Sequence, residues 1–202
     1  QQLISQGENQ QLDFKFAISD AKKIARTISA FSNTDGGKLL IGVKDNGALY
    51  GIRNEEEYYV LESAADMYCR PSIKLDFKRW VVESKTIIEV MVPKCKRLPC
   101  LAPDENGKWQ AYIRYNDQNL RADPVQVKVW QRGKSRKNSA IVFTDKEKLL
   151  MAELDAKDKL SFVEISKLLR FTSKDTEDLL VNLIAMNILK IHTFPGEVYY
   201  TR

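Results

Sequence analysis

Residues 28–47 read ISAFSNTDGGKLLIGVKDNG, and this stretch decides the fold of the first half of the chain. The segment NTDGG at 33–37 gathers turn-forming residues and ends any helix that runs into it. The mostly apolar run KLLIGVK at 38–44 predicts a buried strand. The segment DNG at 45–47 predicts a tight hairpin turn, because Asn-Gly tolerates positive φ at both central positions, and residues 48–52 are the expected returning strand. A helix end, a buried strand and a hairpin in close succession predict an α/β domain.

Elements on both sides of this stretch follow from the same kind of signal. Upstream, Ile24, Ile28 and Phe31 form one apolar stripe of a helix that Ser19 or Asp20 caps. Downstream, the pattern predicts a helix and three strands, at residues 55–69, 73–82, 86–92 and 110–115. These elements complete the first domain.

A basic segment separates this domain from the rest of the chain. Residues 131–139, QRGKSRKNS, contain no acid and no large apolar residue, which is typical of a linker. We therefore expect a first domain at 1–130, a basic linker at 131–143 and a second domain at 144–202.

The second domain is expected to contain three helices and a β-hairpin. The helices are predicted at 144–154, 161–170 and 173–186, with Ser173 as the cap of the third, and the strands at 188–193 and 198–201. This order predicts a winged helix, a variant of the helix-turn-helix.

The third of these helices is a poor match to the DNA major groove. It begins with Ser173, Lys174, Asp175, Thr176, Glu177 and Asp178. The DNA phosphates would repel this helix end, because it carries three carboxylates and only one lysine. The third helix could therefore contact a partner protein, or a second copy in a homodimer, at least as readily as it could recognise bases.

The charge of the chain favours polyanions as partners. Its net charge is +5, and its pI is about 9.0. Residues 1–143 hold 23 Lys and Arg against 17 Asp and Glu, whereas residues 144–202 hold 9 against 10. The basic surplus is therefore expected in the first domain and the linker, where it favours association with nucleic acid.

Several other classes of protein are disfavoured by composition and motifs. No stretch approaches the roughly 20 apolar residues of a membrane span, and the first residues lack the features of a secretory signal. Three cysteines without a CxxC pair, and one histidine, make a poor zinc site and predict free thiols in a reducing cytoplasm. The phosphate-loop, GxSxG and HExxH motifs are absent.

Three blocks of sequence resemble a known family. Glu8 is followed five residues later by Asp13-Phe14-Lys15, then by AFSNTDGGKLLIGVKDNG at 30–47 and AYIRY at 111–115. Together they resemble the AlbA-like domain of Schlafen proteins and of many bacterial regulators, over roughly residues 3–130. The resemblance implies an α+β chain, in which a Schlafen AlbA-like α/β domain with a mixed sheet precedes the winged helix, as in bacterial members.

In Schlafen members with ribonuclease activity, three carboxylates form a metal-dependent site, and the resemblance places them at Glu8, Asp13 and Asp45. Clustered carboxylates hold Mg²⁺ or Mn²⁺, which activates water and offsets charge on a phosphate. Two departures count against activity here: Asp13 replaces the usual Glu, and Lys44 stands where an acid often precedes Asp45. The same acids also suit ordinary surface and turn positions.

The spacing of the first two carboxylates adds a geometric condition. Glu8 and Asp13 are five residues apart, so one continuous strand would put them on opposite faces. A shared site therefore needs a break, with Glu8 on the turn or helix before the strand.

Phosphate-contacting residues are expected on both the first domain and the linker. The resemblance brings Lys15, Lys38 and Arg114 near one another. The linker adds four candidates, Arg132, Lys134, Arg136 and Lys137.

Three functions from different classes are therefore open. The favoured one is a cytoplasmic nucleic-acid-binding protein of the transcriptional-regulator type, most simply a DNA-binding protein, which needs no cofactor. The alternative is a metal-dependent endoribonuclease that uses Glu8, Asp13 and Asp45 with Mg²⁺ or Mn²⁺. The third is a protein-interaction adaptor, which the acidic third helix favours.

Overall fold

A computed structural model describes residues 2–133 and 144–202 of the chain. The chain divides into two compact units, Gln1–Arg121 and Ala122–Arg202. In the first unit the elements are η1 (Ile4–Gln6), β1 (Leu12–Lys15), α1 (Ala21–Asn33), β2 (Gly37–Ile41), α2 (Glu56–Met67), β3 (Asp76–Val82), β4 (Lys85–Val92), β5 (Leu101–Pro103), β6 (Trp109–Tyr115) and β7 (Gln118–Arg121).

The main sheet of the first unit is mixed, as expected. Its strand order is β1-β2-β4-β3; β1 and β2 are parallel, and the other two pairs are antiparallel. Successive side chains of β2 enter two different cores. Leu39 and Ile41 pack into the main core with α1, whereas Leu40 packs on the opposite face with Leu12 and Phe14. This two-sided burial explains why the predicted strand is almost entirely apolar.

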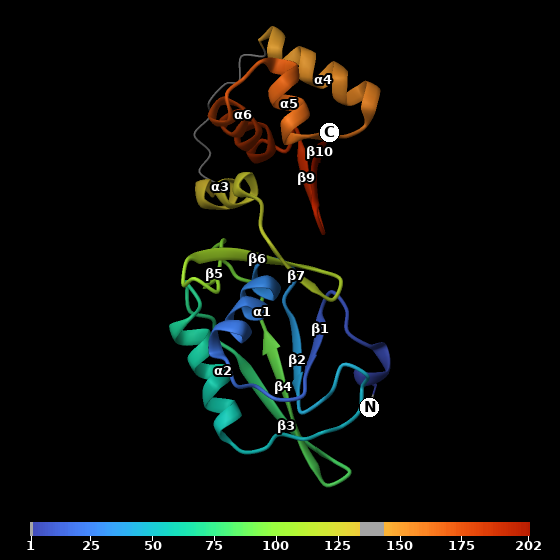
Figure 1. Ribbon diagram of the computed structural model, residues 1–202, viewed down its shortest axis with the longest axis vertical. Helices are drawn as coiled ribbons and strands as arrows, with labels where there is room; N and C mark the ends of the chain where they lie inside the picture. The colour runs from blue at the N-terminus through green and yellow to red at the C-terminus, as the bar shows by residue number, and fades with distance from the viewer. Residues whose placement is uncertain (1, 134–143) are drawn as a thin grey trace. The chain divides into compact units, whose positions relative to one another are not determined.

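Helix α1 begins and ends as the sequence predicts. Of the two candidate caps, Asp20 is the one used: its Oδ1 accepts hydrogen bonds from the backbone N–H groups of Lys22 (2.9 Å) and Lys23 (3.2 Å). The helix contacts the main sheet and also a second sheet, in the order β5-β6-β7, so α1 lies between the two (Figure 1).

Two polar side chains in the last turns of α1 tie this helix to the second sheet. Asn33 Nδ2 donates to the carbonyls of Cys100 and Tyr112, both at 2.8 Å, and its Oδ1 accepts from the Cys100 N–H at 2.7 Å. Ser29 Oγ donates to the Cys100 carbonyl at 2.8 Å and accepts from the Tyr112 N–H at 3.2 Å. Both side chains are buried. Ser29 and Asn33 therefore act as a structural clamp, and Asn33 belongs to the AFSNT block at 30–34.

A hairpin turn follows β2, but its central residues are Asp45 and Asn46, not Asn46 and Gly47 as predicted, and of the last two only Gly47 has a positive φ, of +80°. The predicted returning strand is also wrong in extent. A 2.8 Å hydrogen bond from the Gly47 N–H to the Lys44 carbonyl closes the turn. Beyond the turn only a single bridge, Val43 to Leu49, follows in place of a strand over 48–52.

A close backbone crossing explains this difference. Gly42 ends β2 with φ +91°, and a Cβ atom on it would lie 2.8 Å from the backbone of Gly51. The carbonyl of Gly42 accepts from the N–H groups of Tyr50 (2.7 Å) and Gly51 (2.8 Å). The chain therefore turns back across itself at Gly42 and cannot continue a regular ladder.

In the second unit the elements are α3 (Pro124–Arg132), α4 (Asp145–Lys157), β8 (Leu160–Ser161), α5 (Phe162–Leu169), α6 (Ser173–Ala185), β9 (Lys190–Phe194) and β10 (Glu197–Thr201). The three predicted helices and the terminal hairpin are all present after residue 144. The short strand β8 joins the hairpin in an antiparallel sheet of order β8-β10-β9. The cap of α6 is Thr172, not Ser173 as predicted, because Thr172 and Asp175 form a reciprocal capping box.

Helix α3 belongs to the second unit, although the sequence placed it in the first domain. It contacts α6, and Val125 is buried in the same core as Leu180 and Tyr200. Lys128 Nζ also lies 2.6 Å from the Glu177 carboxylate on α6. The division of the chain therefore falls after Arg121, not after residue 130.

This division also changes where the charge lies. With the boundary after Arg121, the first unit holds 18 Lys and Arg against 16 Asp and Glu, and the second holds 14 against 11. The net charges are +2 and +3. The expected concentration of basic charge in the first domain depended on assigning α3 and the linker to it, so a binding surface must be sought from local geometry.

We expect a fragment of residues 122–202 to be more stable than one of residues 131–202. Loss of α3 uncovers the core around Leu180 and removes the buried Val125, which contributes about 1.5–3 kcal/mol. For a unit of this size the melting temperature should fall by roughly 10 °C or more. Circular dichroism of the two fragments measures this difference. Equal melting temperatures would contradict the boundary at Arg121.

Among the residues of the two described ranges, no helix is both long enough and apolar enough to cross a membrane.

Candidate nucleic-acid interface

Glu8 lies before β1, on the turn that follows η1, as a shared carboxylate site requires. Its Oε1 accepts a 2.8 Å hydrogen bond from the Phe14 N–H, so the side chain folds back along β1. Burial raises the pKa of Glu8, and the negative charges of Asp13 and Asp45 raise it further, against the opposing effects of the Phe14 N–H and Lys15. The three predicted carboxylates therefore share one electrostatic neighbourhood.

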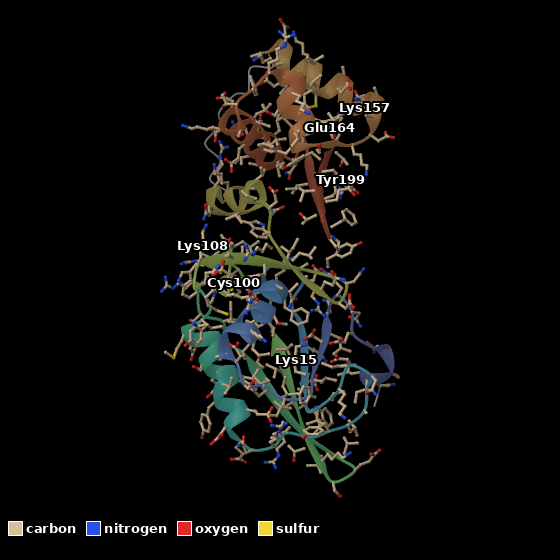
Figure 2. The ribbon with its side chains drawn as sticks, viewed as in Figure 1. Lys15, Cys100, Lys108, Lys157, Glu164 and Tyr199 are labelled. Atoms are coloured by element: carbon tan, nitrogen blue, oxygen red, sulfur yellow. The ribbon has the colours of Figure 1, made fainter. Side chains whose placement is uncertain are left out.

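Asp13 is the buried member of the three. Its Oδ1 lies 3.0 Å from Arg114 Nη2 and its Oδ2 lies 2.5 Å from Lys15 Nζ. Lys15 Nζ is also 4.0 Å from Glu8 Oε1, so one ammonium group bridges two of the carboxylates. Figure 2 labels Lys15.

Asp45 occupies a different setting from the other two. It is exposed and lies in the turn at 44–47, where its backbone is part of the hairpin. Its charge reaches Glu8 through space.

The arrangement does not suit Mg²⁺ or Mn²⁺, because a cation of the protein already meets each oxygen of Asp13. Oxygen ligands of such ions must converge at about 2.0–2.5 Å on one point. Within residues 2–133 and 144–202, no group of three His, Cys, Asp or Glu side chains is placed to hold a metal ion. The carboxylates of this part of the chain therefore do not fit a divalent metal ion.

Arg114 serves the interior of the first unit, not a phosphate-contacting face. Its side chain is 1% exposed. Besides Asp13, its guanidinium donates to the carbonyls of Asn116 (2.9 Å) and Asn9 (3.3 Å), and to Asn119 Oδ1 (3.0 Å). Each of the three guanidinium nitrogens thus has an acceptor inside the first unit, so the expectation that Arg114 contacts phosphates has no support in the geometry.

Lys38 is also engaged with a carboxylate, on the outer face of the main sheet. Its Nζ lies 2.8 Å from Glu89 Oε1, and the Trp80 indole N–H donates to Glu89 Oε2 at 2.8 Å. Burial acts to raise the pKa of Glu89, but the hydrogen bonds from Lys38 and Trp80 outweigh it and lower that pKa. Glu89 is therefore a stable anion that neutralises Lys38.

The basic linker residues fall mostly outside the described part of the chain. Lys134, Arg136 and Lys137 lie in 134–143, which the structure does not describe. Arg132 is the last residue of α3, and its Nη1 donates to Asn182 Oδ1 on α6.

A cluster that the sequence did not predict lies directly beyond Lys15. Phe16 and Tyr50 are 48% and 41% exposed, and their rings meet edge to face with centroids 5.9 Å apart. Lys44 Nζ lies 5.7 Å from the centroid of the Tyr50 ring, and the Arg53 guanidinium carbon lies 5.9 Å from it. The only signal in the sequence was an aromatic residue beside a basic one, which is too common to single out a site.

Backbone hydrogen bonds hold together the chain segments that carry the two rings. The Lys15 carbonyl accepts from the Gly42 N–H at 2.7 Å, and the Gly42 carbonyl accepts from the Tyr50 N–H at 2.7 Å. The end of β1, the end of β2 and the chain at Tyr50 are thus joined in one hydrogen-bonded row, which positions Phe16 against Tyr50.

A hollow of about 650 Å³ borders this cluster. Lys15, Phe16, Lys23 and Arg53 contribute to its lining, with Glu57 at its base. Glu57 is 4% exposed and accepts hydrogen bonds from the N–H groups of Ile18 (3.0 Å) and Arg53 (2.9 Å). This buried carboxylate therefore holds the two loops that form the hollow, and its own charge is satisfied by those donors.

The fold and the site together define a class of protein: an α+β domain that presents cationic and aromatic side chains next to a group of carboxylates. The family model described as Schlafen, AlbA_2 matches residues 8–123, and the chain belongs to this family. Family membership supports a nucleic-acid-related role. No curated protein matches the chain.

Fifteen chains among the solved structures match this chain, including the following two. The DIP2311 protein from Corynebacterium diphtheriae is 20% identical, with a TM-score of 0.45; the match covers 61% of this chain and 27% of that one. The second is the N-terminal domain of a protein from Nitrosomonas europaea that is named as related to the ATP-dependent DNA helicase RecG. It is 21% identical with a TM-score of 0.37, and the match covers 60% of this chain and 92% of that one.

Proposed function

We propose that this protein binds nucleic acid through the first unit, as a regulator-type protein without a cofactor. The observation that carries the proposal is the pair of exposed cations, Lys44 and Arg53, beside Tyr50. Among the described residues neither forms an ion pair with a carboxylate, in contrast to Lys15 and Lys38. Exposed cations of this kind are free to exchange their counterions for phosphates.

The second unit is proposed as a winged helix that contacts DNA or a partner, including a second copy of the chain. Its helices and strands follow the order of that fold, with α6 as the candidate recognition helix. Two of the three carboxylates near the start of α6 are engaged within the protein: Asp175 accepts from Thr172, and Glu177 pairs with Lys128. The acidic charge that α6 presents to a phosphate is therefore smaller than its sequence indicates.

The proposal predicts that the double variant Lys44→Ala/Arg53→Ala binds nucleic acid more weakly. For every phosphate that the variant no longer neutralises, the magnitude of the log–log salt slope should fall by about 0.9 on duplex DNA and about 0.7 on a single strand. Fluorescence anisotropy over a salt series measures both the affinity and the slope on the full chain. The matched control is Lys74→Ala/Lys108→Ala, which removes the same charge from exposed positions of the same unit; Figure 2 shows Lys108 well away from Lys15.

Two results would count against the proposal. Equal losses of affinity in the two double variants would mean that only the overall charge matters. Failure of the wild type to bind DNA or RNA at low salt would promote the protein-interaction adaptor instead.

The nuclease is the alternative function that the resemblance to Schlafen ribonucleases implies for Glu8, Asp13 and Asp45, although the described positions of these carboxylates do not favour a metal site. The same binding series with added Mn²⁺ tests it. Cleavage by the wild type that is lost in Glu8→Gln, Asp13→Asn and Asp45→Asn would make this alternative the primary function.

A further inference from the structure

We propose that Phe16 and Tyr50 form a stacking platform for unpaired bases, so that the ligand of the first unit is a single-stranded nucleic acid. This inference rests on the proposed function and adds to it the strand state of the ligand and the groups that recognise it. DNA and RNA share the required chemistry, which is a flat base next to a phosphodiester.

The first step is the exposure of the two rings. Phe16 and Tyr50 are 48% and 41% exposed. A solvent-exposed ring is common on protein surfaces, but here two of them meet at 5.9 Å with an interplanar angle of 85°. The pair therefore presents ring surface in two nearly perpendicular directions.

The second step is the charge beside the rings. The Lys44 ammonium and the Arg53 guanidinium lie within 6 Å of the Tyr50 ring centroid, at 5.7 and 5.9 Å. Each nucleotide carries its base and its phosphate only a few ångströms apart. A ring flanked by cations can therefore meet both parts of one nucleotide, which is the usual composition of single-strand binding surfaces.

The third step is the choice between single strands and duplexes. In a duplex the faces of internal bases are covered by their neighbours, so exposed rings have nothing to stack upon. Unpaired bases offer both faces, and stacking on an aromatic ring needs no particular sequence. The cations alone would serve a duplex equally well, whereas the rings favour the single strand.

The fourth step is that the platform is preformed. The hydrogen bonds from Gly42 N–H to the Lys15 carbonyl and from Tyr50 N–H to the Gly42 carbonyl, both 2.7 Å, fix the backbone under both rings. A rigid platform loses little conformational entropy when a ligand binds.

The experiment compares four ligands of equal length by fluorescence anisotropy with the full chain. They are single-stranded DNA, single-stranded RNA, duplex DNA and an abasic DNA strand, which keeps the phosphates but has no bases. The proteins are the wild type, Phe16→Leu/Tyr50→Leu, Tyr50→Phe and the control Tyr59→Leu. Tyr59 is 67% exposed on α2, so its replacement removes an exposed ring elsewhere in the same unit.

We expect the wild type to bind the base-containing strands more tightly than the abasic strand. The double leucine variant should lose about 5- to 100-fold in affinity for the base-containing strands, because one or more bases no longer stack. Its affinity for the abasic strand should stay within about twofold, because the cations are retained. Tyr50→Phe, which keeps the ring, and Tyr59→Leu should behave as the wild type. Whichever of single-stranded DNA and single-stranded RNA binds more tightly shows whether the protein prefers deoxyribose or ribose.

The outcomes separate the two proposals. If the wild type binds none of the ligands, the proposed function fails. If it binds the duplex and abasic strand as tightly as the base-containing single strands, or if the leucine variant loses affinity for all of them equally, nucleic-acid binding stands and the stacking platform is refuted. Thermal melting of each variant confirms that the comparison is between folded proteins.

Discussion

Replacing Arg114 with Met is expected to lower the free energy of unfolding of the first unit by about 3–5 kcal/mol, the typical cost of removing one partner from a buried ion pair. The Asp13 side chain is 5% exposed and would keep Lys15 as its only cation. The substitution also removes donors from the carbonyls of Asn9 and Asn116. Methionine fills a similar volume, so the loss of stability reports charge and hydrogen bonding more than packing.

Urea denaturation of the full chain measures this effect, and tryptophan fluorescence follows each unit. Trp80 and Trp109 report on the first unit and Trp130 on the second. The control is Arg79→Met, since Arg79 is 65% exposed and pairs at 3.7 Å with Glu55, which is 83% exposed; it should cost no more than about 1 kcal/mol.

A second substitution makes the interpretation sharper. Asp13→Asn in the Arg114→Met background should recover part of the stability, because the amide no longer leaves a buried negative charge. A loss near 1 kcal/mol for Arg114→Met alone would show that the guanidinium is dispensable to the fold and would return Arg114 to the candidate phosphate ligands.

Asn33→Ala is expected to destabilise the first unit by roughly 2–4 kcal/mol. The side chain is 5% exposed and links α1 to the Cys100 and Tyr112 backbones through three hydrogen bonds. Its removal takes this partner from the Cys100 N–H and the Tyr112 carbonyl, at about 1–3 kcal/mol for each group left unsatisfied in a buried place, less any relaxation. The Cys100 carbonyl keeps its hydrogen bond from Ser29. The same urea titration measures it.

The control for this clamp is Asn54→Ala. Asn54 is exposed, and its side chain exchanges hydrogen bonds with Glu56, two residues along the chain. The effect of this substitution should stay within about 0.5 kcal/mol. If Asn33→Ala were equally mild, Asn33 would not act as part of a clamp, and its place in the AFSNT block would need another explanation.

The sequence allowed most of the elements of the fold to be predicted, because their signals are local. The apolar stripe of α1 with its Asp20 cap, and the two-sided apolar run of β2, depend on neighbours a few residues apart. A break between Glu8 and β1 was predicted only as a condition of a shared carboxylate site, and the structure has one, because Glu8 lies on the turn before β1. The sequence also contains a signal for the start of α3, because Asp123 followed by Pro124 is a cap with proline at the first helical position. Our sequence interpretation overlooked it, and the domain boundary was misplaced as a result.

The candidate site could not be predicted to the same extent, because its partners are distant in the sequence. Arg114 is expected on a surface by its residue type, and only a fold that brings it to Asp13 across about a hundred residues explains its burial. Phe16 and Tyr50 likewise come together through a backbone crossing at Gly42. Residue type and spacing contain no information about such a crossing.

The clamp formed by Ser29 and Asn33 has a consequence for how function is inferred across this family. Its hydrogen bonds end on backbone atoms inside the first unit, so selection for folding alone is enough to preserve Ser29 and Asn33, the second of which lies in the AFSNT block. Chains recognised by this block would then share a scaffold, whatever each of them does. Distinguishing binders from nucleases among them calls for comparison at other positions, above all Glu8, Asp13, Phe16 and Tyr50.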